Sequence, residues 1–331
     1  MSLALQGHPV LVTGAGGFIG GHLVEQLVTL GAQVRAFVRY TSRSERHVLA
    51  HLPEGIRREV ELIRGDLRDE EAVGAAVRGC EVVFHLGAIV SIPYSYAHPR
   101  EVLETNVLGT LNVLQALRDQ SGTRLVHTST SEVYGSAVYW PMDESHPLQA
   151  QSPYAASKTA ADKLVESYVC AYDLDAVTVR PFNAFGPRQS GRAIIPTIAA
   201  QGLAGVPLRL GSLAPRRDFT FVSDTADGYI AAAEAPTATG RVINLGSGRA
   251  ISIGELATRI GELIGRELTV QEDPARLRPV GSEVMHLQAD NRLALDLLGW
   301  RPRVSLEDGL ARTIAWLKDN PHWVSPSDYQ I

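Results

Sequence analysis

Residues 10–20 read VLVTGAGGFIG, and this stretch decides the fold. The apolar run 10–12 predicts a short buried strand, and leucines at 23, 27 and 30 follow at helical spacing. Glycines between a strand and a helix let the backbone approach a pyrophosphate, which free N–H groups at the helix start can bind. The G-x-x-G-x-x-G spacing differs from the commonest dinucleotide fingerprint, but its flanking strand and helix fit a βαβ unit. We therefore expect a dinucleotide-binding turn made by Gly14, Gly17, Phe18, Ile19 and Gly20.

Composition and charge narrow the class of protein. The chain has 331 residues, 45% of them hydrophobic and 20% charged, so it can fold around a large core. A net charge of -5 argues against a general nucleic-acid binder, and interrupted apolar runs argue against a membrane span. With only Cys80 and Cys170, a reducing cytoplasm is the expected setting. We expect no bound metal.

Further apolar runs predict strands at 33–38, 61–64, 82–86 and 125–128, and their ends suggest how the cofactor binds. After the second strand no acid is present to bind a ribose, and Arg39 and Arg43 favour the 2′-phosphate of NADP over NAD, unless they are solvated loop residues. Asp66 can accept a hydrogen bond from adenine, or it can belong to a helix cap. The remaining candidates near the cofactor are Leu67, Leu86, Ala88 and Asn106.

Tyr154 and Lys158 are the candidate catalytic pair. Ser152 can cap a helix that has Pro153 in its first turn, and residues four apart share one helix face. Lys158 would then lower the pKa of Tyr154 and let it act as a base near neutral pH. The motif alone also suits an ordinary amphipathic helix. Residues upstream of it must therefore decide between a catalytic pair and a structural helix. The polar run 129–135 follows a strand and should face the same crevice, although it could be only a turn cap.

Taken together, these features resemble the extended short-chain dehydrogenase/reductase superfamily over nearly the whole chain. The resemblance rests on the glycine turn, Asp66, Asn106, Thr130, the Tyr154–Lys158 motif and the run from Arg180 to Pro187. It implies an α/β fold with a doubly wound parallel Rossmann sheet, mainly residues 1–180. A smaller α/β nucleotide-sugar lobe would take mainly residues 181–331, with some exchange of elements. It also implies that Thr130 orients a sugar hydroxyl, Tyr154 takes its proton and Lys158 holds the nicotinamide ribose.

The resemblance further implies a diphosphate site made by arginines. The segment 216–219 is similar to an Arg-Asp-aromatic element, and Arg278 belongs to a late Arg-Pro element. Asn183, Arg192, Arg217 and Arg278 are the expected substrate-binding residues. Arg188 and the others are expected to converge on one diphosphate, although each could be a solvated loop charge.

Glu132 points to the reaction. Members of the superfamily begin by oxidising C4 of the sugar, and in 4,6-dehydratases a glutamate at this position removes the C5 proton. The triplet Thr130-Ser131-Glu132 is similar to that of GDP-mannose dehydratases, whereas dTDP-glucose dehydratases carry Asp in place of Ser131; UDP-glucuronate decarboxylases share the triplet. The acid that protonates the departing hydroxyl could be Glu132, a serine-bound water or Tyr154.

Other stretches most resemble UDP-N-acetylglucosamine 4,6-dehydratases of the legionaminic-acid type. They are residues 127–135, 143–148, 151–154, 180–190 and 278–284. The expected enzyme holds its NADP or NAD tightly and recycles it, with a UDP-sugar as the favoured substrate. A 4-epimerase or a UDP-glucuronate decarboxylase remains an alternative, as does a cofactor sensor without catalysis.

The resemblance also implies a homodimer. Superfamily members pack two helices from each subunit into a four-helix bundle, and the matching segments are 100–118 and 154–172. The apolar faces of these segments could belong to the core instead.

Overall fold

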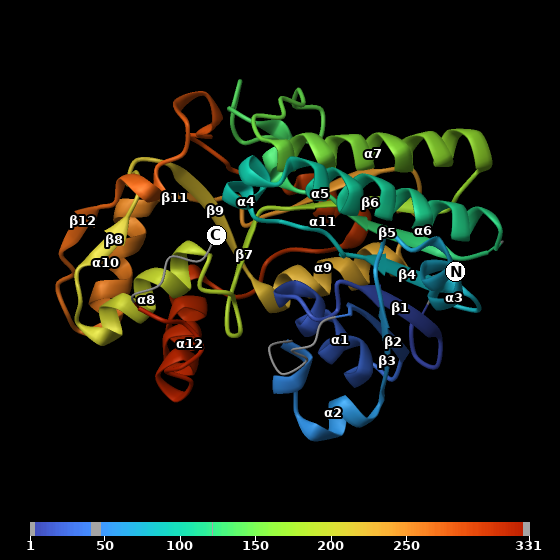
Figure 1. The fold of residues 1–331 in the computed structure, drawn as a ribbon, viewed down its shortest axis with the longest axis horizontal. Helices are drawn as coiled ribbons and strands as arrows, with labels where there is room; N and C mark the ends of the chain where they lie inside the picture. The colour runs from blue at the N-terminus through green and yellow to red at the C-terminus, as the bar shows by residue number, and fades with distance from the viewer. Residues whose placement is uncertain (1–3, 41–47, 121, 327–331) are drawn as a thin grey trace.

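The computed structural model describes residues 4–40, 48–120 and 122–326, and its central layer is a seven-stranded sheet (Figure 1). All neighbouring strands are parallel. From one edge to the other the strands are β10 (Val242–Leu245), β6 (Ala176–Pro181), β5 (Arg124–Thr128), β4 (Val82–His85), β1 (Pro9–Thr13), β2 (Gln33–Arg39) and β3 (Val60–Gly65). The strand order changes direction between β1 and β4, which is where doubly wound sheets open a crevice for a ligand.

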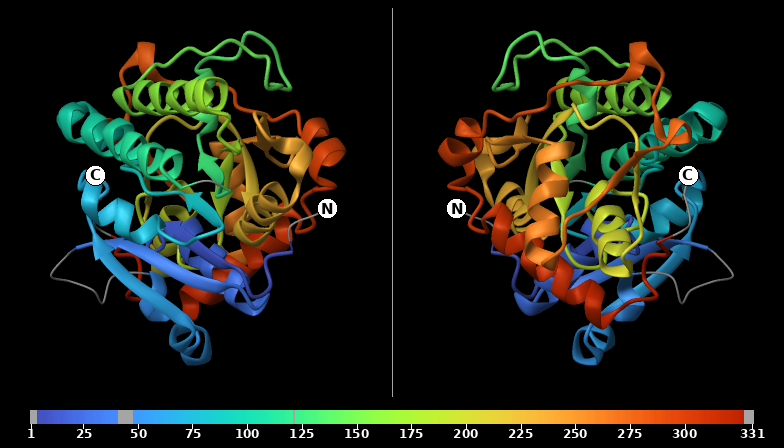
Figure 2. Two further views of the ribbon diagram at one scale, coloured as in Figure 1. Left: turned by 90° about the vertical axis from the view of Figure 1, so that its right-hand side faces the viewer. Right: turned by 90° about the vertical axis from the view of Figure 1, so that its left-hand side faces the viewer.

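Helices cover both faces of this sheet (Figures 1 and 2). One face carries α3 (Glu70–Val77), α6 (Gly109–Arg118) and α7 (Pro153–Tyr172), and the other carries α1 (Phe18–Thr29), α9 (Val222–Glu234) and α11 (Arg292–Leu298). Side chains alternate between the two faces of a strand, so Leu11 packs in the core beneath α6 while Val10 and Val12 pack beneath α1. The predicted Rossmann-type α/β fold is confirmed.

Most predicted elements form as expected, with one difference in detail. Ser152 caps α7 by accepting a hydrogen bond from Ala155 N at 3.1 Å, and Pro153 lies in the first turn. The helix expected over residues 100–118 is instead three successive pieces. These are α5 (Pro99–Leu103), a π-helical turn η3 (Glu104–Leu108) and α6. Single π turns inside α-helices are frequent at functional sites, and this one contains the buried Asn106.

A second group of elements packs around a core of its own beside the sheet (Figure 1). It contains a three-stranded sheet of β11 (Ala250–Ser252), β9 (Arg216–Phe221) and β7 (Asn183–Phe185), and the pair β12 (Val270–Glu272) and β8 (Leu208–Leu210). Its helices are α8 (Ile194–Ala204), α10 (Ile253–Ile264) and α12 (Leu306–Asp319). Leu310, Ile314 and Leu317 form the buried apolar face of α12.

Short helical segments complete the described fold. They are η2 (Val48–His51), α2 (Glu54–Arg58), α4 (Ile92–Ala97), η4 (Ser131–Tyr134), η5 (Pro236–Ala238), η6 (Pro274–Arg276) and η7 (Val280–Ser282). A small cluster that includes Val133, Phe182 and Leu287 holds η4 against the segment 284–289. In the described ranges, no helix has the length and apolar character needed to cross a bilayer.

Candidate active site

The candidate residues meet where β1, β4 and β5 end. The Thr13 hydroxyl, at the end of β1, accepts a hydrogen bond from Gly87 N at 3.0 Å and so joins the ends of β1 and β4. The polar turn after β5 comes next along the same edge, because β4 and β5 are paired in register. Since all these strands are parallel, their carboxyl ends lie on one side of the sheet.

The glycine turn has no room for side chains. Gly14 has φ +67°, and a Cβ there would lie 2.8 Å from the Gly87 backbone. A Cβ at Gly20 would lie 2.3 Å from the Gly14 carbonyl oxygen. Gly17 is the N-cap of α1, and no side chain of the described residues caps this helix start. The first turn, with Phe18 and Ile19, therefore offers backbone N–H groups to an anion, as a dinucleotide pyrophosphate requires.

Asn106 ties the edge of the sheet to α7. Its side-chain oxygen accepts a hydrogen bond from Ile89 N at 2.8 Å, and its nitrogen donates to Ile89 O at 3.0 Å and to Ser157 Oγ at 2.9 Å. Leu86 and Ala88 precede Ile89 on the same segment, and both are partly exposed. Asn106 thus fixes the loop after β4 relative to the helix that carries Tyr154.

Charged residues gather beyond β2 and β3. Arg39 donates a hydrogen bond to Glu101 at 3.2 Å, and the other oxygen of Glu101 accepts one from the Tyr94 hydroxyl at 2.5 Å. Arg68 binds both carboxylate oxygens of Asp66, which holds the pKa of Asp66 at about 2. Leu67 packs under Gly87 and Gly109. Arg43 lies outside the described residues.

Thr130 and Glu132 share one turn after β5. Thr130 caps η4, and its hydroxyl accepts a hydrogen bond from Glu132 N at 3.2 Å. Ser131 is buried beneath the turn, whereas the Glu132 side chain keeps 13% of its surface exposed. The turn therefore presents a hydroxyl and a carboxylate close to each other.

Tyr154 and Lys158 are both buried, with 7% and 3% of their surface exposed. Burial raises the pKa of Tyr154; the Thr130 side chain lowers it by hydrogen bonding, and Glu132 and Asp162 raise it. Burial lowers the pKa of Lys158 to about 8, against the attraction of Asp162. Desolvation dominates the pKa of Tyr154, and Thr130 is the group that opposes it. Both Thr130 and Glu132, the two residues of the turn after β5, therefore affect the pKa of Tyr154. The effect of Lys158 on the Tyr154 pKa stays a prediction.

Arg217 and Arg278 reach the same region from the second group of elements. Arg278 Nη1 lies 3.9 Å from a carboxylate oxygen of Glu132 and 3.9 Å from one of Glu283. Arg217 donates a hydrogen bond to Glu283 at 3.1 Å. Burial lowers the pKa of Arg217, and the charge of Glu132 raises it. Arg278 Nη1 and Asn183 Oδ1 are buried without a hydrogen-bond partner in the described structure, so both are able to bind a ligand.

The match to known proteins covers most of the chain. The family model for GDP-mannose 4,6 dehydratase matches residues 11–313. The chain belongs to the extended short-chain dehydrogenase/reductase family. A UDP-glucose 4-epimerase of Mycolicibacterium smegmatis is 33% identical over 93% of this chain and 98% of its own. A dTDP-glucose 4,6-dehydratase of Xanthomonas campestris is 31% identical over 95% of this chain and 94% of its own.

A solved structure shows the same architecture with a cofactor. The dTDP-glucose 4,6-dehydratase DesIV of Streptomyces venezuelae, with NAD and TYD bound, superposes with a TM-score of 0.85. It is 30% identical and covers 96% of this chain and 99% of its own. The chain is therefore an extended short-chain dehydrogenase/reductase whose relatives are nucleotide-sugar epimerases and dehydratases, and the family relationship supports an NAD(P) cofactor.

Some arginines of this family member do not join the cluster. Arg188 donates hydrogen bonds to Glu25 at 2.5 Å and to His22 at 2.9 Å, both on α1. Arg216 pairs with Glu255 at 3.1 Å, and Arg192 is exposed to solvent. Arg188 and Arg216 are therefore paired with carboxylates of α1 and α10, and their contact with a diphosphate stays a prediction.

Sequence reasoning missed the buried polar network around Asp162, one helical turn beyond Lys158. His127 lies on β5, Asp162 on α7 and Arg180 on β6, and their side chains contact one another. Two signals were available. Asp162 repeats the four-residue spacing that separates Tyr154 from Lys158, and His127 interrupts an apolar strand.

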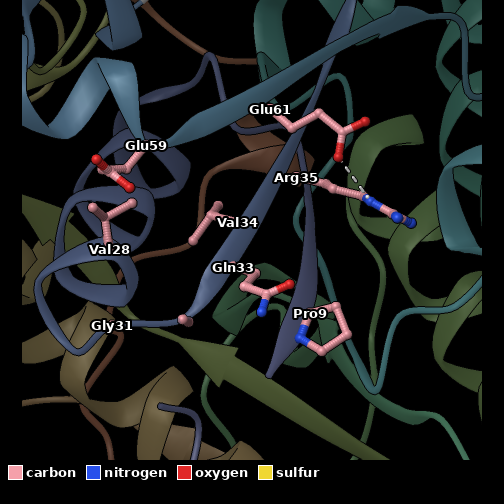
Figure 3. A pocket seen from close by; sticks show the side chains of 9 residues that line it. Pro9, Val28, Gly31, Gln33, Val34, Arg35, Glu59 and Glu61 are labelled. Carbon is pink, nitrogen blue, oxygen red and sulfur yellow. Dashed lines mark hydrogen bonds and ion pairs between the residues drawn. The ribbon is translucent and has the colours of Figure 1, made fainter. Parts of the chain in front are cut away.

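A hollow elsewhere in the enzyme lies away from these residues. It measures about 290 Å³ and is lined by Pro9, Val28, Gly31, Ala32, Gln33, Val34, Arg35, Glu59 and Glu61 (Figure 3). These residues lie at the amino ends of β1, β2 and β3, whereas Tyr154 and Thr130 lie beyond the carboxyl ends of the sheet. Arg35 and Glu61, two of its charged residues, form an ion pair with each other at 3.0 Å. The candidate chemistry therefore belongs to the carboxyl edge.

Proposed function

We propose that this enzyme is an NAD(P)-dependent nucleotide-sugar 4,6-dehydratase that converts UDP-N-acetylglucosamine to a 4-keto-6-deoxy sugar nucleotide. One observation carries the proposal. Glu132 follows Thr130 in the same turn, and its charge acts on the buried Tyr154. An enzyme that only oxidised and reduced C4 would have no need for a carboxylate in this place. The dehydratase relatives and the match to the GDP-mannose 4,6 dehydratase family support this reading.

Tyr154 and Thr130 would perform the first step. Thr130 binds the sugar C4 hydroxyl, and Tyr154 takes its proton as the C4 hydride leaves. NAD(P), held by the glycine turn, would supply the hydride acceptor for this step. Lys158, as an ammonium, would stabilise the phenolate form of Tyr154 that accepts this proton.

Glu132 would perform the second step. The C4 ketone makes the C5 proton acidic, and Glu132 takes this proton. The C6 hydroxyl then leaves as water with a proton from an acid in the site, which gives a C5–C6 double bond. Hydride returns to C6 and a proton to C5, so no external reductant is consumed. Glu132 itself, a water on Ser131, or Tyr154 are the candidate acids.

The binding residues follow from the same proposal. The first turn of α1 and the glycines 14, 17 and 20 would hold the pyrophosphate of the cofactor, because only a backbone without side chains approaches it closely. Asn183, Arg192, Arg217 and Arg278 would bind the nucleotide sugar, with Arg192 contributing after a rotation of its exposed side chain. Arg39 supports NADP, although its ion pair with Glu101 competes for a 2′-phosphate. Tight retention of the cofactor is part of the proposal.

Two alternatives within the family are favoured by specific observations. A UDP-glucose 4-epimerase is among the relatives with the highest identity listed above. Arg278 next to Glu132 would also suit a substrate with a carboxylate, as in UDP-glucuronate decarboxylation. A sensor without catalysis would have no use for a buried phenol and ammonium, so we rank it last.

A homodimer through a four-helix bundle accompanies this proposal. Leu103 and Leu108 expose 44% and 49% of their surface on α5 and η3, and Tyr172 exposes 52% at the end of α7. A second copy of the chain would bury these side chains. We expect Leu108→Glu to convert the dimer to a monomer in sedimentation experiments; wild type that sediments as a monomer refutes the assembly. We also propose that the chain forms two lobes divided near residue 180. A cytoplasmic location is a further proposal.

The deciding experiment is mass spectrometry of the products formed from UDP-N-acetylglucosamine. The dehydratase gives a product lighter by one water, with no added reductant. An epimerase gives a product of unchanged mass, and decarboxylation of UDP-glucuronate gives a product lighter by carbon dioxide. No water loss from any 6-hydroxy sugar nucleotide tested would refute the dehydratase assignment.

A further inference from the structure

Asp162 lies on α7 one helical turn beyond Lys158 and is 5% exposed. Both of its carboxylate oxygens are occupied. His127 Nε2 lies 3.2 Å from Oδ1, and Oδ2 accepts hydrogen bonds from Ser129 Oγ at 2.7 Å and from Arg180 Nη2 at 3.0 Å. Two strands, β5 with the residue after it and β6, therefore converge with α7 on a single buried charge.

The buried charges beneath the catalytic pair do not cancel. Lys158 and Arg180 are cations, and Asp162 is the carboxylate that acts on both. Arg180 shares its charge between Asp162 and the Tyr134 hydroxyl, to which Nη1 donates at 3.1 Å. Within the part of the chain that the structure describes, the Lys158 ammonium forms no hydrogen bond or ion pair. A buried ammonium without a direct partner loses its proton readily.

The other titratable groups around Lys158 do not supply a negative charge in place of Asp162. His85 on β4 and His127 on β5 face it, and burial lowers the pKa of both histidines, so they are neutral at neutral pH. Arg180 on β6 is a cation, and burial raises the pKa of the Tyr134 phenol in η4 and of the Tyr154 phenol on α7. Glu132 acts on Tyr154 and on the arginines of the other elements.

We propose that Asp162 is a positioning residue that keeps the Lys158 side chain in its charged form beside Tyr154. The Asp162 carboxylate lies one helical turn beyond Lys158 on α7, and Arg180, which also binds it, takes up part of its charge. This inference rests on the proposed roles of Tyr154 and Lys158. If Asp162 only neutralised Arg180 within the fold, its removal would change stability and leave the titration of Lys158 unaltered.

The chain offers a direct readout because it contains only three lysines, Lys158, Lys163 and Lys318. Protein labelled with carbon-13 at the lysine ε position gives one signal for each, and Lys158→Arg identifies the signal of Lys158. The exposed Lys163 and Lys318 serve as internal references. The titration needs neither substrate nor turnover, so it tests Asp162 even if the enzyme proves not to be a dehydratase.

The central variant is Asp162→Asn, which keeps the shape of the side chain and removes its charge. We expect the Lys158 midpoint to fall by about one pH unit or more, while the other two lysines stay in place. Ser129→Ala is the matched control, since it removes a hydrogen bond to the same carboxylate without changing charge. Its Lys158 midpoint should equal that of wild type.

Arg180→Gln is a second test, in which the Lys158 midpoint is expected to move in the opposite direction. It tests the proposal even if Asp162→Asn does not fold. Removing the cation that binds Asp162 leaves more of the carboxylate's field for Lys158, so the Lys158 midpoint should rise. Circular dichroism checks that each variant is folded. A wild-type midpoint in folded Asp162→Asn, or a fall in Arg180→Gln, overturns the proposal.

Discussion

The guanidinium of Arg278 lies 3.9 Å from the carboxylate of Glu132, although the two residues come from opposite halves of the chain. The same nitrogen is 3.9 Å from Glu283 and makes no hydrogen bond within the described residues. Arg278 is thus held between two carboxylates without being bound tightly by either. An anionic substrate can compete for such a cation, and Glu132 stays free to take a proton.

Replacing the proposed C5 base should separate the two halves of the reaction. In Glu132→Gln we expect C4 oxidation to continue, seen as reduced cofactor, while water loss slows about 100- to 10,000-fold. Glu283→Gln is the matched control, because it removes the other carboxylate near Arg278 but is not part of the Thr130 turn. Elimination at the wild-type rate in Glu132→Gln would remove this residue from the mechanism.

The buried Lys158 should make stability depend on pH. Its pKa falls from 10.5 to about 8 in the folded protein, so between these values the unfolded chain binds more protons. Stability attributable to this residue should therefore rise with pH through that window. Lys158→Met carries no buried charge, so its free energy of unfolding should exceed that of wild type by the largest amount below about pH 8. This difference in the free energy of unfolding should shrink by about 2–3 kcal/mol toward pH 10. Urea unfolding of both proteins at the two ends of the window measures it; a constant difference contradicts the prediction.

The glycine turn should tolerate no side chain. Gly14→Ala combines a positive φ with a Cβ 2.8 Å from the Gly87 backbone, so we expect a loss of more than about 3 kcal/mol in stability. Gly79→Ala is the control, because Gly79 has φ +76° but its Cβ would meet nothing within 4 Å. Strain alone should cost Gly79→Ala about 1–2 kcal/mol. Isothermal titration should show weaker cofactor binding for Gly14→Ala only, and equal effects of the two changes would refute this role of the turn.

Cofactor choice should depend on Arg39. If Arg39 binds a 2′-phosphate, Arg39→Ala should weaken NADP binding about 10-fold or more and change NAD binding little. Glu101→Gln should do the opposite and strengthen NADP binding, because it releases Arg39 from its ion pair. Direct titration of both cofactors into each protein measures the ratio. Equal losses for NAD and NADP in Arg39→Ala would end the preference for NADP.

Local patterns in the sequence determined the elements of the fold. The glycine turn, the Ser152 cap and the apolar runs act through neighbours a few residues apart, so the sequence alone predicts them. The same holds for Tyr154 and Lys158, which share a helix face because they are four residues apart. The sequence also predicts that Thr130 and Glu132 lie at the carboxyl edge of the sheet, because the carboxyl ends of parallel strands lie together.

Only the tertiary structure decided which charges meet. Arg188 and Arg278 look alike in the sequence, but one binds α1 and the other faces Glu132. The partners of Asp162 come from two strands that are neighbours only once the sheet has formed. Long side chains reach across elements, and desolvation depends on everything packed around them, so neither the pairing nor the pKa of a buried group follows from local spacing. Sequence placed Tyr154 and Lys158 on one helix, and the packing of β5 and β6 beneath that helix determined their charges.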